Sequence, residues 1–207
     1  MKYGFATVAA AVPRVKVADT HYNILAIEEQ IAIANSRGVE LIVFPELSIT
    51  GYSCQDLFHS QLLLEKAEEA LMHLLDFSRK LDIISVVGMP VAVGDILLNC
   101  AVVVQQGVII GIVPKTFLPN YGEFYEKRWF CSALDIHSQT IYIAGSPITI
   151  TPEPKVFTTY DGLKFGIEIC EDLWSPLPPS NNLTLAGADI IVNLSATDEL
   201  IGKHQNL

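Results

Sequence analysis

The stretch VFTTYDGLKFGIEIC, residues 156–170, contains two short apolar runs joined by a turn, and it indicates how the second half of the chain folds. The runs 156–160 and 163–169 predict two strands, and Asp161-Gly162 between them is typical of a tight hairpin turn. A cysteine, Cys170, follows directly where the second strand is expected to end. The stretch therefore predicts a hairpin that delivers a thiol to the end of a sheet.

Working outward, helical and strand patterns alternate in the first half of the chain. Strands are expected at 2–12, 40–44, 83–87, 97–104 and 108–113, the last two forming a hairpin, and a further strand at 189–194. One helix begins at Asp19 or Thr20 and ends near Gly38, with an apolar face of Ile24, Ile27, Ile31 and Ala34. Other helices are expected around 63–75 and 183–188. This order predicts a mixed α/β sandwich, with residues 120–154 as an irregular and therefore functionally interesting segment.

Composition excludes several classes of protein. The 207 residues fit one domain, and half of them are hydrophobic, which suits strands covered on both faces. Breaks in every apolar run argue against a membrane span. A formal net charge of −10 with 13 Lys and Arg residues argues against nucleic-acid binding. Four widely spaced cysteines predict free thiols and a cytoplasmic location, and five histidines without ligand spacing predict no metal site.

Three polar residues lie just beyond predicted strands, at Glu46, Lys115 and Cys170. Alone, each has an ordinary explanation as a solvated loop carboxylate, a surface lysine or a packing cysteine. Together they suit acyl transfer, if the strand ends meet at one edge of a sheet. A thiolate attacks, and a nearby cation is expected to lower the thiol pKa and stabilise an oxyanion. A carboxylate can carry the proton between thiol, leaving amine and water.

The strings FPELSITGY (44–52), PKTFLPNYGEFYEKRWF (114–130) and GIEICEDLW (166–174) resemble, in this order, the three signature regions of the nitrilase (carbon–nitrogen hydrolase) superfamily. With GYSCQDLF and NLSA, the resemblance narrows to the N-terminal glutaminase domain of glutamine-dependent NAD synthetases and runs through essentially the whole chain. It implies an α/β, nitrilase-like four-layer α-β-β-α sandwich. Residues 1–207 would form a single amidohydrolase domain truncated at its C-terminus.

The resemblance assigns roles to individual residues. Glu46, Lys115 and Cys170 match the catalytic triad, and Glu126 matches a second glutamate that supports the lysine. The glutamine pocket would comprise Tyr52, Tyr121, Phe124, Glu171, Thr197 and Lys203. Thr197 stands where serine is common and Lys203 where arginine is common. For the aromatic residues, ordinary packing is the alternative.

The activity implied by the resemblance is release of ammonia from glutamine through a thioester on the cysteine. No cofactor is expected in this domain, which has no Gly-rich phosphate loop. ATP and deamido-NAD would belong to an absent synthetase domain that consumes the ammonia. The implied partners are glutamine, that synthetase domain and further copies of the chain in a homo-oligomer, with no nucleic acid and no membrane. Two alternatives stay open: a free-standing amidase acting on another small amide, and a non-catalytic interaction domain.

Overall fold

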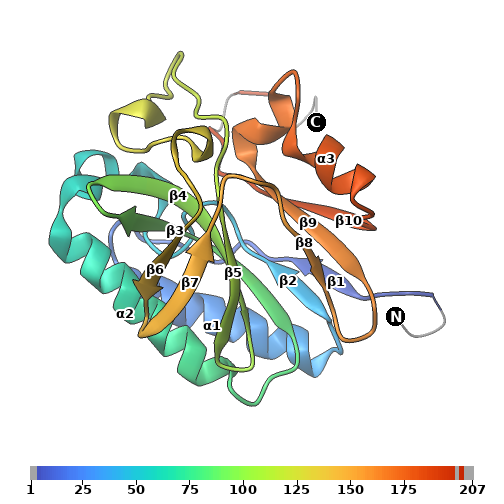
Figure 1. The fold of residues 1–207 in the computed structure, drawn as a ribbon. Coiled ribbons are helices and arrows are strands. Elements are labelled where there is room, and N and C mark those ends of the chain that lie inside the picture. The colour runs from blue at the N-terminus through green and yellow to red at the C-terminus, as the bar shows by residue number, and fades with distance from the viewer. Residues whose placement is uncertain (1–3, 199–200, 203–207) are drawn as a thin grey trace.

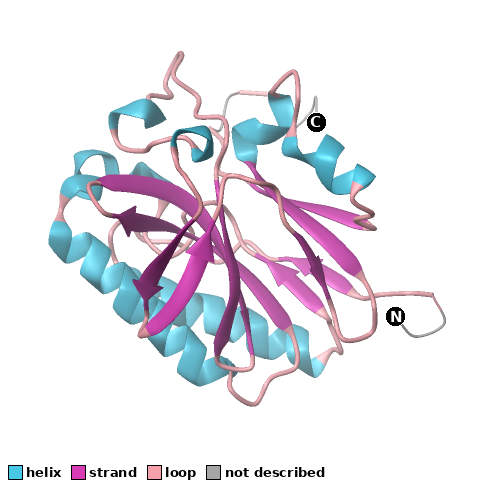
Figure 2. Cartoon of the chain, in the orientation of Figure 1, coloured by secondary structure: helices cyan, strands magenta, loops and turns pink. Residues whose placement is uncertain are grey.

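The computed structural model describes residues 4–198 and 201–202, which form two packed sheets with helices on the outer faces (Figures 1 and 2). The first sheet has the order β1-β2-β3-β4-β5, the second has the order β10-β9-β8, and β6 and β7 form a separate hairpin. The strands are β1 (Val8–Ala10), β2 (Leu41–Val43), β3 (Ile84–Val93), β4 (Ile96–Gln105), β5 (Val108–Pro114), β6 (Gln139–Ile143), β7 (Ser146–Ile150), β8 (Val156–Thr158), β9 (Lys164–Ile169) and β10 (Ile190–Leu194). The helices are α1 (Thr20–Ser36), α2 (Gln61–Ser78) and α3 (Pro179–Leu185), with short 3-10 helices η1 (Tyr52–His59), η2 (Glu126–Arg128), η3 (Ala133–Asp135) and η4 (Cys170–Trp174).

Helices α1 and α2 cover one face of the first sheet. The Asp19 side chain caps α1 by accepting a hydrogen bond from the Tyr22 backbone N–H at 3.1 Å. The predicted apolar face of this helix is buried, and it packs with Leu71 and Leu74 of α2 against the sheet. The expected helix and its buried face are therefore confirmed.

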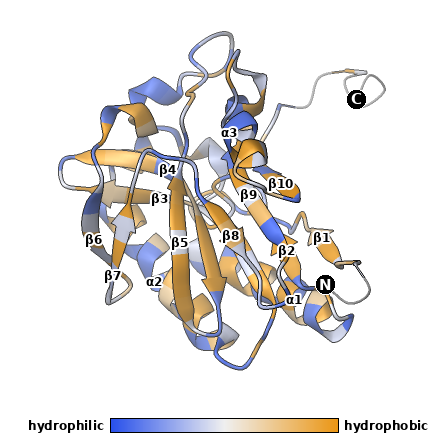
Figure 3. Cartoon of the chain, turned by 45° about the vertical axis from the view of Figure 1, so that its right-hand side comes forward, coloured by the Kyte–Doolittle hydropathy of each residue, from blue (hydrophilic) through white to orange (hydrophobic). Residues whose placement is uncertain are grey.

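A second apolar core fills the space between the two sheets. It joins Val86, Ala101 and Val103 of the first sheet to Phe165 and Ile167 of the second. Figure 3 shows the same property along the chain, because strands of both sheets are hydrophobic over much of their length. This core makes the two sheets the inner layers of the molecule.

Helix α3 covers the outer face of the second sheet. Gly166 allows this contact, because a Cβ at this position would lie 2.8 Å from the Leu183 Cδ1 atom of α3. The layers therefore run helix, sheet, sheet, helix, as predicted (Figure 1). No helix in the described part of the chain is long and apolar enough to cross a bilayer.

Several boundaries differ from the sequence prediction. Strand β3 continues past Gly88 and Pro90, because β2 pairs only with Ile84–Val86 and leaves Pro90 with a neighbour on one side. Helix α3 begins earlier than predicted, with Pro179 in its first turn, a position that suits proline. Strand β1 is shorter than the run that predicted it.

The expectation of an irregular segment at 120–154 is wrong in its second half, where β6 and β7 pair as an antiparallel hairpin. The sequence pattern that indicates β6 is an alternation with a period of two residues. Ile141 and Ile143 pack inward, while Thr140 and Tyr142 are exposed. The turn residues Ala144 and Gly145 both have positive φ, at 48° and 73°. The alternation is short and polar, and this made it hard to distinguish from a loop.

Strand direction brings the functional segments together. Strands β2, β3 and β5 run the same way, so their carboxyl ends lie at one edge of the first sheet. Gly88 of β3 lets this edge close, because its backbone touches the turn that follows β2. A Cβ there would lie 2.2 Å from the Leu47 backbone nitrogen and 2.8 Å from the Glu46 carbonyl carbon.

Gly88→Ala should therefore destabilise the chain by about 3 kcal/mol or more, because backbone atoms of the turn at residues 45–47 leave no room for a methyl group. Urea unfolding at neutral pH measures this loss. Ala92→Ser, at an exposed position of the same strand, is the control and should stay within about 0.5 kcal/mol of the unsubstituted chain. Equal stability of the two variants would contradict the close approach.

Candidate active site

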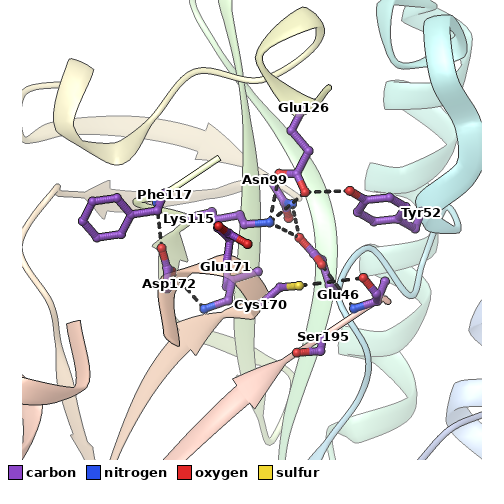
Figure 4. A network of polar contacts seen from close by, with 12 residues as sticks. Glu46, Tyr52, Asn99, Lys115, Phe117, Glu126, Cys170, Glu171, Asp172 and Ser195 are labelled. Carbon is purple, nitrogen blue, oxygen red and sulfur yellow. Dashed lines mark hydrogen bonds and ion pairs between the residues drawn. The ribbon is translucent and has the colours of Figure 1, made fainter. Parts of the chain in front are cut away.

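The four side chains predicted to be catalytic converge between the two sheets (Figure 4). Glu46 follows β2, Lys115 follows β5, Cys170 follows β9, and Glu126 begins η2. The Lys115 Nζ atom donates to Glu46 Oε1 at 2.7 Å and to the Glu126 oxygens at 2.8 and 2.9 Å. Residues far apart in the sequence thus form one ion cluster.

This cluster is removed from water. The exposed fractions are 2% for Glu46, 0% for Lys115 and 1% for Glu126. Burial alone would lower the pKa of the Lys115 ammonium, but the Glu46 and Glu126 carboxylates outweigh it and raise that pKa, so the lysine stays charged. Burial, followed by the negative charge of Glu46, raises the pKa of Glu126. The lysine is therefore a fixed positive charge.

Cys170 occupies a strained turn at the end of β9. Its φ angle is 48°, a left-handed conformation that is uncommon for a residue with a side chain and often marks a functional site. The thiol donates to the Ala196 carbonyl oxygen across 3.7 Å, and it lies beside Glu46, whose negative charge acts on it (Figure 4). The backbone thus aims the sulfur at the ion cluster.

The expectation of a lowered thiol pKa is wrong for this resting state. Burial, together with the negative charge of Glu46, raises the pKa of Cys170 to about 12, and Lys115 offsets this only in part. The sequence indicated the nearby cation but could not show how deeply the thiol is buried. Cys170 is therefore a thiol at neutral pH, and it would need a base in order to act as a nucleophile.

Two contacts to Glu46 were not predicted from the sequence. The Asn99 Nδ2 atom donates to Glu46 Oε1 at 2.7 Å, and the Ala196 N–H donates to Oε2 at 3.2 Å. The sequence could have identified Asn99 as a candidate site residue, because it is a polar residue inside the apolar run of β4. Both oxygens of the carboxylate are thus held in place.

Asp172 ties the two strand ends together. Its Oδ1 atom accepts from the backbone N–H groups of Thr116 and Phe117 at 3.0 and 2.7 Å, just after Lys115. Its Oδ2 atom accepts from the Ile169 N–H at 2.9 Å, just before Cys170. One buried carboxylate therefore sets the spacing between the lysine and the thiol.

The aromatic residues predicted for the pocket form a chain beside the thiol. The Tyr52 hydroxyl donates to Glu126 Oε1 at 2.7 Å, and its ring meets Phe124 edge-on with centroids 6.4 Å apart. Phe124 in turn meets the Tyr121 ring at 6.2 Å, and the Tyr121 hydroxyl donates to Glu171 at 2.8 Å. The structure brings these four predicted residues to one side of the site.

Thr197 directly follows Ala196, which contacts both Glu46 and the thiol, so it lies next to the site along the chain. Lys203 lies outside the described residues. Among the residues described, no group of three or more His, Cys, Asp or Glu side chains is arranged to hold a metal ion.

Lys115→Met should destabilise the chain by about 3–5 kcal/mol, because it leaves two buried carboxylates without their cation. Lys127→Met, at an exposed lysine nearby, is the matched control and should have little effect. Thermal and urea unfolding of both variants make the comparison. A similar stability of the two would show that the buried ion cluster is not required for folding.

Asp172→Asn should change how stability depends on pH. Burial raises the pKa of Asp172 from 3.8 to about 6, so in this range the folded chain holds a proton that the unfolded chain has released. Ionisation of Asp172 therefore costs stability as the pH rises through this window, about 3 kcal/mol in total. Urea unfolding between about pH 4 and 7 measures the free energy of unfolding at each pH. The decrease that comes from ionisation of Asp172 should be absent in Asp172→Asn. The exposed Asp95→Asn controls for the loss of one charge, and parallel curves for Asp172→Asn and the unsubstituted chain would refute the assignment.

Comparison with known proteins identifies the family of the chain. The family model of the carbon-nitrogen hydrolases matches residues 6–206. The glutamine-dependent NAD(+) synthetase of Mycobacterium tuberculosis is 35% identical over 207 residues, covering 99% of this chain and 30% of that protein. The human glutamine-dependent NAD(+) synthetase is 32% identical over 192 residues, covering 89% of this chain and 27% of that protein. The chain thus spans about 30% of the length of such relatives.

Solved structures share the fold. A glutamine-dependent NAD(+) synthetase from Cytophaga hutchinsonii superposes with a TM-score of 0.83 at 29% identity, covering 97% of this chain and 32% of that chain. An amidase from Nesterenkonia sp. superposes with a TM-score of 0.71 at 19% identity, covering 96% of this chain and 68% of that chain. Since the family model covers nearly all of its residues, the chain belongs to the carbon-nitrogen hydrolase family.

Proposed function

We propose that the chain is a glutamine amidohydrolase domain in which Cys170 is the nucleophile. The observation that carries the proposal is the buried set of a thiol, a proton-accepting carboxylate and a fixed ammonium group. The Cys170 thiol lies beside Glu46, and Lys115 is anchored to both Glu46 and Glu126 (Figure 4). This set supplies the nucleophile, the base and the positive charge that acyl transfer from an amide requires.

The chemistry follows from the resting protonation states. As the Cys170 sulfur bonds to the amide carbon, its proton moves to Glu46, so no free thiolate is needed beforehand. The Lys115 ammonium, which is already charged, stabilises the negative oxygen of the tetrahedral intermediate. Glu46 then passes the proton to the nitrogen as the C–N bond breaks, and ammonia leaves. Water, activated by the same carboxylate, hydrolyses the thioester and restores the thiol.

Glutamine as the amide is supported by the polar groups around the thiol. A free amino acid presents an ammonium and a carboxylate, and each needs an oppositely charged or polar partner. Glu171, next to the nucleophile and bonded to Tyr121, offers a carboxylate for the ammonium group. Tyr52 and Phe124 would line the side chain of the substrate, and Thr197 and Lys203 would bind its carboxylate.

The proposal extends to the longer proteins that the chain resembles. The ammonia would feed an ATP-dependent synthetase domain that converts deamido-NAD to NAD. Within the described residues β10 is an edge strand, and Ile190, Ile191 and Val192 on it are partly exposed. Further strands of the same domain, or contacts in a homo-oligomer, would cover this edge.

The proposed nucleophile can be tested by covalent labelling. The chain should form a single adduct on Cys170 when incubated with 6-diazo-5-oxonorleucine, an electrophile that mimics glutamine, and excess glutamine should prevent it. Intact-mass measurement followed by peptide mapping identifies the labelled residue.

Cys131 provides the matched control, because it is partly buried like Cys170. Cys131→Ala should keep the label, and Cys170→Ala should lose it. Equal labelling of several cysteines, or labelling that glutamine does not prevent, would refute glutamine as the substrate.

A further inference from the structure

Asn99 is a buried amide in the middle of an apolar strand. Alternate residues of β4 face opposite sides, with Leu98 and Cys100 packed toward the helices and Ala101 packed between the sheets. Asn99 therefore points between the sheets, toward the active site, and its exposed fraction is 1%. Burying an amide costs free energy unless it is hydrogen-bonded, so its contacts indicate why it is there.

Only the NH2 group of this amide makes a hydrogen bond within the described part of the chain. The Asn99 Nδ2 atom donates to Glu46 Oε1 at 2.7 Å, whereas Asn99 Oδ1 has no hydrogen-bond partner within the described part of the chain. Lys115 Nζ donates to the same Glu46 oxygen at 2.7 Å. Glu46 Oε1 thus receives two short hydrogen bonds, while Oε2 receives one longer bond, 3.2 Å from the Ala196 nitrogen. The spare acceptor capacity of Glu46 lies on Oε2.

We propose that Asn99 is a positioning residue that, together with Lys115, occupies Glu46 Oε1 and so makes Oε2 the oxygen that carries the proton. The inference rests on the proposed function, since it concerns the same carboxylate. The S–H bond of Cys170 breaks as its sulfur bonds to the amide carbon, and the proton goes to Oε2. The proton then passes from Oε2 to the departing amide nitrogen as the C–N bond breaks, which restores the carboxylate.

The charges around Glu46 explain why this donor is a neutral amide. The facing groups are Lys115 after β5, Glu126 from η2, Tyr52 from η1 and Cys170 after β9. The Tyr52 hydroxyl is bonded to Glu126, so it does not serve Glu46. A second cation would hold the proton-carrying carboxylate in its charged form more strongly. An amide adds a hydrogen bond without adding charge.

Two substitutions separate this role from packing. Asn99→Leu removes the donor, and the nearly isosteric Asn99→Asp donates only when it is protonated. The measurement is the rate constant for alkylation of Cys170 by iodoacetamide, followed by peptide mass spectrometry, which needs no glutamine turnover. Glu46→Gln gives the rate without the base. In Asn99→Leu the alkylation rate constant should be about 10- to 100-fold lower than in the unsubstituted chain and should approach the Glu46→Gln value, as expected for losing a hydrogen bond to a charged group.

The pH dependence is a readout that packing alone would not produce. The ratio of the Asn99→Asp to the Asn99→Leu rate constants cancels the general rise of thiol reactivity with pH. It should exceed one at about pH 5, where the introduced carboxyl group can be protonated and donate to Glu46, and it should fall toward one at about pH 8, where that group is charged and no longer donates. Cys100→Ala, on the opposite face of the same strand, is the control and should lower thermal stability without changing alkylation of Cys170.

The outcomes distinguish the two proposals. If Glu46→Gln is slow but Asn99→Leu alkylates like the unsubstituted chain, Asn99 does not act through Glu46 and the inference is overturned alone. A ratio that does not change with pH would also overturn it. If Glu46→Gln alkylates at the unsubstituted rate, Glu46 is not the base, and the proposed mechanism fails together with the inference.

Discussion

Removing an ammonium group and two carboxylates from water costs several kcal/mol per ion, and this cost is offset only when each ion is held close to its partner. Lys115, Glu46 and Glu126 meet this condition because three separate segments of the chain place the lysine within 2.9 Å of both carboxylates. The positions of the neighbouring groups follow from this cluster. Asn99 donates a further hydrogen bond to Glu46, and Tyr52 donates one to Glu126. The fold therefore has to hold strand ends at fixed separations, and most of its unusual features serve that purpose.

Those features are found in the backbone. Gly88 lets β3 approach the turn that carries Glu46, and Cys170 adopts a left-handed conformation that turns its sulfur toward the same point. Asp172 links the segment after Lys115 to the end of β9 through three backbone hydrogen bonds. The lysine belongs to one sheet and the cysteine to the other, so the apolar core between the sheets also sets the active-site geometry. The packing of the sheets and the geometry of the candidate site thus depend on the same contacts.

In the resting site the lysine is charged and the thiol is neutral. Lys115 stays charged because two carboxylates surround it, whereas Cys170 stays neutral because burial outweighs the effect of the lysine. A neutral resting thiol is protected from unspecific electrophiles and oxidants, which react with thiolates. In the proposed mechanism, attack then depends on proton transfer to Glu46 when a substrate is in place. In that mechanism, the orientation of the carboxylate matters as much as the presence of the three candidate catalytic residues.

The sequence by itself determined the layered α/β class, the apolar face of α1 and the hairpin that ends at Cys170, and it predicted the candidate catalytic residues. These follow from local periodicity, from turn residues such as Asp161-Gly162, and from motifs that stand next to strand ends. The β6–β7 hairpin was missed because its alternation is short and partly polar. Only the tertiary structure decided that the thiol is protonated, that Asn99 holds Glu46 and that Asp172 joins two strand ends. Burial and hydrogen bonding between residues far apart in the chain set these properties, and no local pattern in the sequence encodes such distances.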